Sequence, residues 1–174
     1  AVVVGAWLIN AMVFRPFNVM GPSMEPTMHT GDRLIVNRIP ITIDALQGKS
    51  YLPSRGHVIV FRNPLFSDMH RDEFVVKRVI AFAGERVVVH NGTVRVYNTQ
   101  YPQGFDPYDY ASIPKTSVSG DVDRVVEVGT IFVIGDNRSG QESMDSRNGI
   151  GLVPLDNIVG PVAMRIYPFT QLSG

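Results

Sequence analysis

After residue 17 the chain consists of short apolar runs, rich in β-branched residues, that are separated by Gly, Pro, Asn and Asp. This pattern is typical of β-strands joined by turns. The Asn91-Gly92 pair between two such runs is the strongest hairpin signal, because its turn needs positive φ at both positions. No strong amphipathic helix is expected after residue 20. The candidate strands are 33–38, 57–62, 74–82, 86–90, 93–98, 125–127, 131–134 and 160–167. The sequence therefore predicts a mainly β fold.

The segment 98–124 differs from its surroundings, because its aromatic residues are scattered among Pro, Gly, Asp and Ser with little periodicity. A stretch of this length without clear elements is usually a lid, an insertion or a loop. We therefore interpret 85–130 as an inserted β/loop subdomain. The catalytic β core is expected to comprise 17–84 and 131–170.

The first 14 residues contain one polar side chain, Asn10, and no charge, and Arg15-Pro16 ends the run. Fourteen residues are too few to cross a bilayer, which needs about 20. The interpretation we favour is that 1–16 is the C-terminal part of a truncated transmembrane anchor, and the alternative is a buried core helix or strand. A cleavable signal peptide is disfavoured because no small-x-small site follows the run.

The composition excludes several classes of binding partner and catalytic site. Lys plus Arg and Asp plus Glu both number 16, so there is no basic excess to indicate a nucleic-acid partner. The absence of cysteine excludes disulfides, thiolate metal sites and a cysteine nucleophile. The four histidines have no zinc-type spacing and no context that marks a base for a Ser–His–Asp triad. We expect neither a metal nor a cofactor.

Ser23 is the first candidate nucleophile, because Gly21-Pro22 and Pro26 surround it with a rigid, exposed turn that would present its hydroxyl. The alternative is an ordinary loop serine. The segment Gln47-Gly48-Lys49-Ser50 imitates the end of a phosphate-binding loop but lacks that motif's first glycine.

Lys77 is the candidate base. It lies within the apolar strand 74–82, where alternation places it on one face with Val75 and Val79. Burial disfavours the charged amine, and a neutral lysine can accept the proton of a serine hydroxyl. The alternative is an edge-strand lysine that extends its amine to solvent. Lys49 and Lys115 lie among Gly, Ser and Pro, where a lysine is solvated.

A third cluster follows the predicted strand 131–134. It comprises Gly135-Asp136-Asn137-Arg138 and Ser143-Met144-Asp145-Ser146-Arg147. Loops at the ends of strands often carry functional sites, although Asp–Arg pairs also stabilise solvated turns.

The three clusters, together with Arg55-Gly56-His57-Val58-Ile59-Val60-Phe61, resemble the boxes of the type I signal peptidase family in the same order. The resemblance covers most of 17–165. It implies a Ser–Lys β core, an N-terminal membrane anchor and a cofactor-free serine endopeptidase that removes signal peptides from exported preproteins.

The resemblance also implies roles for individual residues. Ser23 would attack the scissile carbonyl, Lys77 would be the general base and Ser143 would orient the lysine amine. Asp145 and Arg147 would brace the third loop, and Arg78 belongs to the box of the general base. The Ser23 backbone N–H would stabilise the oxyanion. Some family members add a serine hydroxyl at the position that Gly21 occupies here. The implied substrate pocket is apolar and consists of Phe17, Val19, Met24, Met28, Val75 and Val76.

The implied substrates are signal peptides with small residues at −1 and −3, which would pair with the strand of Val75 and Val76 by strand addition. The implied location is the plasma membrane, with the catalytic domain facing the extracytoplasmic side and lipid as a further partner. An organellar or thylakoid membrane is the alternative. No oligomeric state is indicated.

Two other functions are open to the sequence. A self-cleaving Ser–Lys repressor-type peptidase shares this fold class but normally carries a DNA-binding domain. A catalytically inactive, secreted β-rich binding module is a further alternative, although intact Ser23 and Lys77 argue against it.

Overall fold

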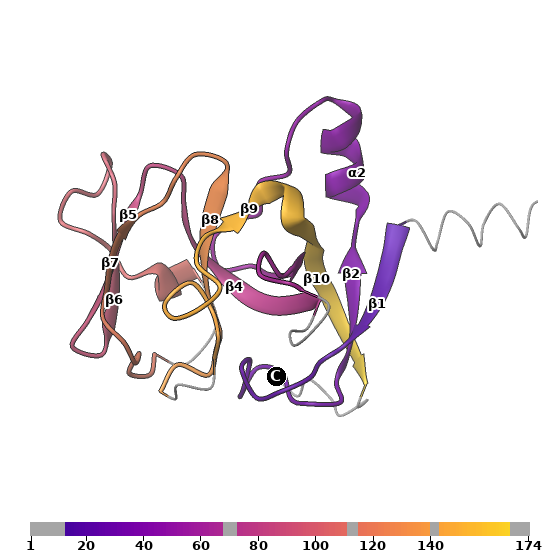
Figure 1. Ribbon diagram of the computed structural model, residues 1–174, viewed down its shortest axis with the longest axis horizontal. Coiled ribbons are helices and arrows are strands. Elements are labelled where there is room, and N and C mark those ends of the chain that lie inside the picture. Colours follow the sequence, from indigo (N-terminus) through magenta and orange to yellow (C-terminus); the bar gives the residue numbers. More distant parts are fainter. Residues whose placement is uncertain (1–12, 68–72, 111–114, 140–142, 168–174) are drawn as a thin grey trace, which may run out of the picture.

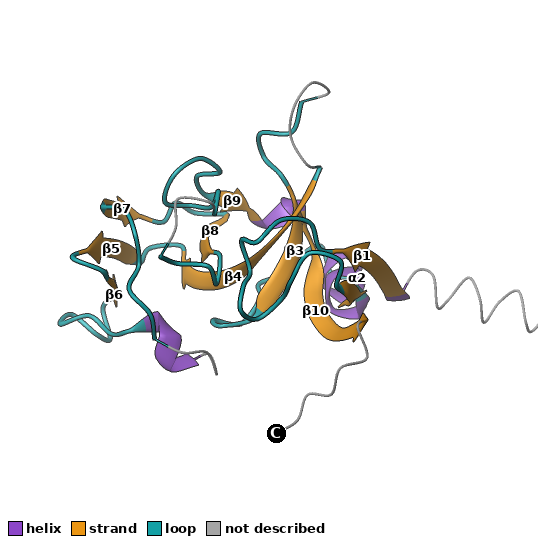
Figure 2. Cartoon of the chain, turned by 90° about the horizontal axis from the view of Figure 1, so that it is seen from below, coloured by secondary structure: helices purple, strands orange, loops and turns teal. Residues whose placement is uncertain are grey.

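The computed structural model describes residues 13–67, 73–110, 115–139 and 143–167. These residues form two antiparallel sheets, so the prediction of a mainly β fold is confirmed. The smaller sheet lies at one end of the molecule and the first two strands lie at the other (Figures 1 and 2).

The larger sheet has seven strands in the order β1-β2-β10-β3-β4-β8-β9. Their bounds are β1 Phe14–Asn18, β2 Arg33–Asn37, β3 Val58–Arg62, β4 Phe74–Phe82, β8 Thr130–Ile134, β9 Val153–Pro154 and β10 Ile158–Tyr167. Across the two sheets, seven of the eight predicted strands coincide with observed strands to within two residues at each end, among them 74–82, which is β4.

Strand β4 holds a central place because its two halves have different neighbours. Residues 74–78 pair with β3, whereas the pairing with β8 begins only at Arg78. Among the described residues, no strand pairs with the other edge of 74–77. This part of β4 therefore offers an unpaired edge next to Lys77.

The smaller sheet has the order β6-β5-β7, with β5 at Arg86–His90, β6 at Thr93–Tyr97 and β7 at Val122–Val125. The predicted hairpin is present, because Asn91 and Gly92 turn between β5 and β6 with φ of 47° and 76°. The strand predicted at 125–127 is displaced toward the N-terminus. The reason is that Val126 is buried in the core, and its backbone bonds to Gly84 and Glu85 lie outside the ladder.

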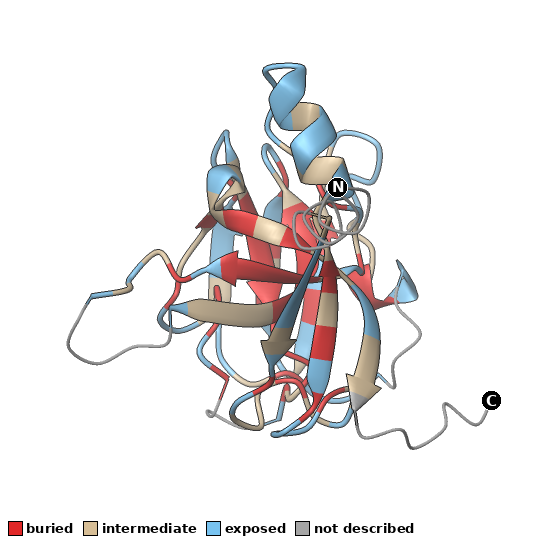
Figure 3. Cartoon of the chain, turned by 90° about the vertical axis from the view of Figure 1, so that its right-hand side faces the viewer, coloured by how far each residue is buried: buried red, intermediate tan, exposed pale blue. Residues whose placement is uncertain are grey.

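Three short helices complete the described structure: α2 at Ile39–Leu46, and the 3-10 helices η1 at Pro107–Tyr110 and η2 at Leu155–Asn157. The sequence analysis assigned no element to α2. This helix has no buried residue, and Figure 3 shows it on the outside of the molecule. Ile41 packs, partly buried, against the core, but the helix lacks the wide buried stripe that predicts a helix from sequence.

The core continues across both sheets. On β8, Phe132 and Ile134 pack against the smaller sheet, whereas Ile131 and Val133 pack on the opposite face. All four side chains are fully buried, which stabilises the fold by about 1.5–3 kcal/mol each. The inserted segment thus shares one apolar cluster with the sheet that carries β4.

Residues 1–12 of the predicted anchor lie outside the described residues, but Phe14, Arg15 and Pro16 belong to β1 and pair with β2. The last residue of the apolar run, Phe14, therefore belongs to the sheet. Within the described part of the chain, no helix has the length and apolar character needed to cross a membrane.

Candidate active site

Ser23 lies on the loop between β1 and β2, partly exposed to solvent. The next residue, Met24, is fully buried in a cluster with Val19, Met28 and Leu34. A backbone bond from Glu25 N to Pro22 O, 3.0 Å long, closes the turn. The apolar anchor below and the closed turn hold the Ser23 hydroxyl in one place at the surface.

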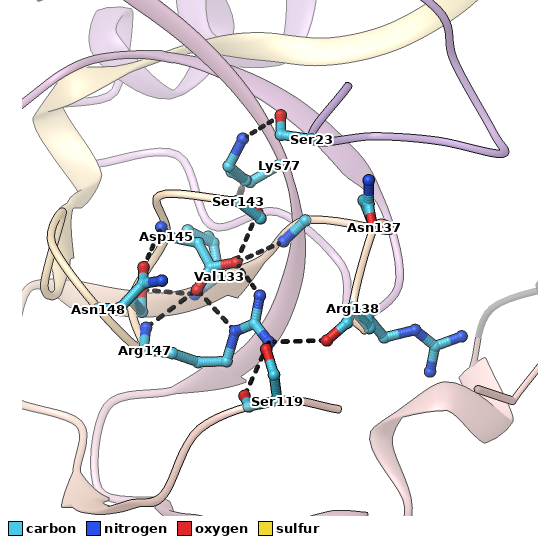
Figure 4. Close-up of polar contacts among 12 residues, drawn as sticks. Ser23, Lys77, Ser119, Val133, Asn137, Arg138, Ser143, Asp145, Arg147 and Asn148 are labelled. Atoms are coloured by element: carbon cyan, nitrogen blue, oxygen red, sulfur yellow. Dashed lines mark hydrogen bonds and ion pairs between the residues drawn. The ribbon is translucent and has the colours of Figure 1, made fainter. Parts of the chain in front are cut away.

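Lys77 reaches Ser23 from β4. Its Nζ donates to Ser23 Oγ over 2.7 Å and to Val76 O over 3.0 Å, and the residue is only 3% exposed (Figure 4). The distance to Oγ is within the reach that proton transfer needs. The two residues that the sequence singled out, 54 positions apart, are therefore in direct contact.

The surroundings of Lys77 lower the pKa of its amine. Burial lowers the pKa of Lys77 to about 8, because the charged amine loses hydration. The carboxylates of Asp145 and Asp136 raise this pKa in part, and Arg147 lowers it. A substantial share of the amine is thus neutral near pH 8, whereas a solvated lysine is almost wholly charged there.

Asp145 makes most of the hydrogen bonds within the loop that carries the third cluster, 135–138 and 143–147, which we call the third loop. Its carboxylate is fully buried and accepts hydrogen bonds from Gly135 N, Ser143 Oγ and the backbone and guanidinium of Arg147 (Figure 4). The buried charge is therefore both paired and bonded, which is the condition under which such a charge is tolerated. The predicted role of Asp145 and Arg147 as a brace fits this geometry.

Ser143 is fully buried, and its Oγ donates to Asp145 Oδ2 over 2.8 Å. The sequence analysis assigns Ser143 to the orientation of the Lys77 amine. The bonds found for Lys77 Nζ run to Ser23 and Val76, so this assignment stays a prediction.

Arg78, the neighbour of Lys77, forms a buried ion pair with Asp136, and together they connect β4 to three other segments. Its Nε donates to Asp136 Oδ1 over 2.8 Å, and its Nη1 donates to Gly56 O over 2.6 Å. Thr27 lies on the same loop as Ser23, between β1 and β2, which we call the nucleophile loop. Its hydroxyl donates to Asp136 Oδ2 over 2.6 Å. The sequence analysis placed Asp136 in the third cluster, but no local signal indicated that Thr27 would meet it.

The inserted segment also contacts the third loop. Arg147 Nη1 donates to Ser119 O over 3.0 Å, and Ser119 N donates to Arg138 O over 2.8 Å. The Arg138 guanidinium lies 3.9 Å from the centre of the Tyr108 ring. Sequence reasoning missed Ser119 and Tyr108 because a contact between an insertion and a distant loop leaves no pattern in either segment.

The predicted pocket residues separate into groups. Val19, Met24 and Met28 are buried in one cluster, and the partly buried Val76 packs against it. Val75 packs on the opposite face of β4. Phe17 is partly exposed, and its ring meets Phe74 edge-on at 5.2 Å. Four of the six residues thus gather beside Ser23.

Comparison with known proteins decides the family. The family model described as "Signal peptidase, peptidase S26" matches residues 1–167. The chain belongs to this family. The sequence-based prediction of a type I signal peptidase is confirmed at this level.

The relatives agree with this assignment. The chain is 36% identical over 170 residues to signal peptidase I T of Bacillus subtilis (strain 168), which covers 96% of this chain and 81% of the relative. It is 29% identical over 181 residues to signal peptidase IB of Staphylococcus aureus, covering 96% of this chain and 85% of the relative. Among solved structures, signal peptidase I of Enterococcus faecalis V583 matches with a TM-score of 0.46 and 23% identity, over 63% of this chain and 96% of that one.

Within the described residues, no group of three or more His, Asp or Glu side chains is placed to hold a metal ion. The chemistry that this site can supply with its own residues is nucleophilic attack by a serine, with an amine as the proton acceptor.

Proposed function

We propose that this S26-family peptidase removes signal peptides from exported preproteins with Ser23 as nucleophile and Lys77 as general base. The observation that carries the proposal is the 2.7 Å contact between Lys77 Nζ and Ser23 Oγ, made by a buried lysine whose pKa is about 8. A serine hydroxyl needs an adjacent base to become a useful nucleophile, and a charged lysine cannot serve as one.

The reaction follows from this arrangement. The neutral Lys77 amine takes the Ser23 proton as Oγ bonds to the scissile carbonyl carbon. The Ser23 backbone N–H donates to the oxyanion that forms. The Lys77 ammonium then gives its proton to the leaving amine, and an acyl-enzyme remains on Ser23. The neutral amine next accepts a proton from water, whose oxygen attacks the ester carbon. The bond from that carbon to Ser23 Oγ then breaks, Oγ takes the proton back from the Lys77 ammonium, and the signal peptide leaves with a new carboxyl group.

The unpaired edge of β4 supports the proposed binding of substrate. An extended peptide adding to 74–77 would place its carbonyl groups along the strand that carries Lys77. The apolar cluster of Val19, Met24, Met28 and Val76 is the matching surface for small residues at −1 and −3. We infer that the segments 17–84 and 131–170 act as the catalytic core, with 85–130 as an insertion.

The location of the enzyme is part of the proposal. The uncharged run 1–14 supports attachment to a membrane. The family resemblance supports a position of the catalytic residues on the extracytoplasmic side. Extraction of the full protein from membranes with carbonate, compared with detergent, tests the attachment. Release by carbonate alone would contradict it.

The central experiment is cleavage of a purified preprotein in detergent by the wild type, Ser23→Ala and Lys77→Ala. Matched controls are Ser54→Ala and Lys49→Ala, which alter an exposed serine and an exposed lysine. We expect cleavage to be lost in both site variants and kept in both controls. Cleavage that survives Lys77→Ala would mean that another group is the base. A wild type inactive on several preproteins would favour the binding-module alternative.

A further inference from the structure

We propose that Asn137 is a positioning residue for the oxyanion donor: it fixes the Pro22–Ser23 peptide so that the Ser23 N–H faces the substrate carbonyl. This inference rests on the proposed function, because it concerns the donor that the proposed reaction uses. It adds a residue to the machinery to which the sequence motifs alone gave no role.

Asn137 contacts the chain on both sides of the nucleophile. Its side-chain Nδ2 donates to Pro22 O over 3.2 Å, and its backbone N–H donates to Ser23 O over 3.0 Å. These are the carbonyl groups of the peptides immediately before and after the Ser23 Cα. Asn137 therefore holds the backbone on both sides of Ser23. It lies 115 positions after Pro22, the acceptor of its side-chain bond.

The bond to Pro22 O has a consequence for the oxyanion donor. A trans peptide is planar, so its C=O and N–H point in opposite directions. Pro22 O also accepts from Glu25 N over 3.0 Å. Two donors therefore converge on this oxygen, and together they aim the Ser23 N–H at the other side of the peptide. Rotation of the peptide would break both bonds.

The Pro22–Ser23 peptide needs support from Asn137, because the nucleophile loop has few side chains that could hold the peptide in place. Gly21 precedes Pro22 with φ of +82°, and it carries no side chain that could donate to the oxyanion or brace the turn. The donor that the proposed reaction uses is therefore the backbone N–H of Ser23. The orientation of that N–H decides how much stabilisation the transition state receives, since such donors act only when they are aligned in advance.

Asn137 is itself held in place. The preceding residue, Asp136, is buried and paired with Arg78 and Thr27. Ser23 O is also packed so close to Gly135 that a Cβ there would overlap it. The loop that carries Asn137 is thus fixed to β4 and to the nucleophile loop, which lets its amide act as a rigid support.

The test compares Asn137→Asp and Asn137→Ala with the wild type. Asp keeps the shape but puts an acceptor where the amide donated, and Ala removes the side chain while the backbone bond to Ser23 O stays. Asn157→Asp is the matched control, because Asn157 is also partly exposed and its Nδ2 donates to a backbone carbonyl, Arg62 O, over 3.0 Å. Thermal unfolding checks that each variant is folded. If one of the two Asn137 variants does not fold, the other is enough for the test.

We expect kcat to fall by about 10- to 100-fold in both Asn137 variants, less than the about 100- to 1000-fold seen when an oxyanion donor is removed outright. KM should change by less than about threefold, because ground-state binding does not use the oxyanion donor. The deficit of Asn137→Ala should persist above pH 9, where an amine with a pKa of about 8 is mostly neutral, so that a small change in the pKa of Lys77 cannot explain it.

Two inhibitors distinguish positioning from general support. A peptide aldehyde with the sequence of the acyl side of the substrate forms a tetrahedral adduct with Ser23 and needs the oxyanion donor, whereas the corresponding alcohol does not. We expect the Ki of the aldehyde to rise by the same factor by which kcat/KM falls, with the Ki of the alcohol unchanged. Equal weakening of both inhibitors, unchanged kinetics, or a deficit that vanishes above pH 9 would each overturn the inference. If Ser23→Ala cleaved preprotein normally, the proposed function itself would fail instead.

Discussion

The backbone of Gly135 lies directly against Ser143: a Cβ added to Gly135 would overlap Ser143 Oγ. The same Cβ would also overlap the carbonyl oxygen of Ser23. Gly135 thus occupies the point where the end of β8, the third loop and the nucleophile loop come together. Its φ is not positive, so the glycine is required by space and not by backbone conformation.

We therefore predict that Gly135→Ala lowers kcat/KM by about 100-fold or more and destabilises the fold by about 1–3 kcal/mol, the usual effect of overpacking. The displaced groups would be Ser143 and the Ser23 backbone, so both stability and activity should fall. Gly149→Ala is the control, because its Cβ would meet only the flexible end of Met144 at 3.1 Å. Denaturant unfolding and peptide cleavage measure the two effects. Full activity in Gly135→Ala would show that the loops adjust freely.

The pH dependence of activity should report the buried amine. Because the neutral form of Lys77 is the proposed base, kcat/KM should rise about tenfold per pH unit at low pH and level off above an apparent pKa of about 8. The profile should be measured from pH 5.5 to 9.5 with a substrate that has no titratable group near the scissile bond. An inflection near pH 6.5 would indicate a histidine base instead and would contradict this assignment.

The same group should affect stability in a pH-dependent way. Between pH 8 and 10.5 the unfolded chain keeps a proton on Lys77 that the folded chain has lost, so the wild type becomes more stable as pH rises through this window. Below pH 8 both states are protonated and the full penalty of burying the charge remains. Lys77→Met removes that penalty, and we expect it to raise the free energy of unfolding by about 3 kcal/mol at pH 7.

The difference between Lys77→Met and the wild type should shrink toward zero as pH approaches 10.5. Urea unfolding at pH 7, 8.5 and 10 tests this trend, and Lys49→Met, at an exposed position, is the control. A difference that stays constant over this range would mean that the folded-state pKa of Lys77 is close to its ordinary value.

The sequence predicted those parts of the molecule that local patterns determine. Alternating β-branched runs located β4 and the Asn91-Gly92 hairpin, because strand periodicity and turn geometry depend on neighbouring residues. The contact between Ser23 and Lys77 was predicted from the context of each residue together with a family resemblance. Their separation of 54 positions shows why either residue alone would have been weak evidence.

The elements that were missed depend on tertiary structure. Helix α2 buries none of its residues, so no apolar stripe indicates it. The roles of Thr27, Asn137 and Ser119 come from contacts between segments that only the folded sheet brings together. Their bonds are made largely with backbone groups or with one shared carboxylate, and such partners leave no trace in a sequence pattern.

Tyr108 offers a test of how tightly the inserted segment packs on the third loop. The residue is 4% exposed, and within the described part of the chain its hydroxyl has no hydrogen-bond partner. Burial raises the pKa of Tyr108, so the hydroxyl keeps its proton and remains an unused donor. The Arg138 guanidinium faces the ring at 3.9 Å from its centre, a contact that does not need the hydroxyl.

We therefore predict that Tyr108→Phe stabilises the protein by about 1 kcal/mol, because it removes a buried polar group left without a partner while the ring keeps its contacts. The melting temperature should rise by about 2–4 °C and cleavage activity should be unchanged. Tyr110→Phe, in the same 3-10 helix but 53% exposed, should have no effect on stability. A loss of stability in Tyr108→Phe would show instead that its hydroxyl makes a stabilising hydrogen bond in the folded protein.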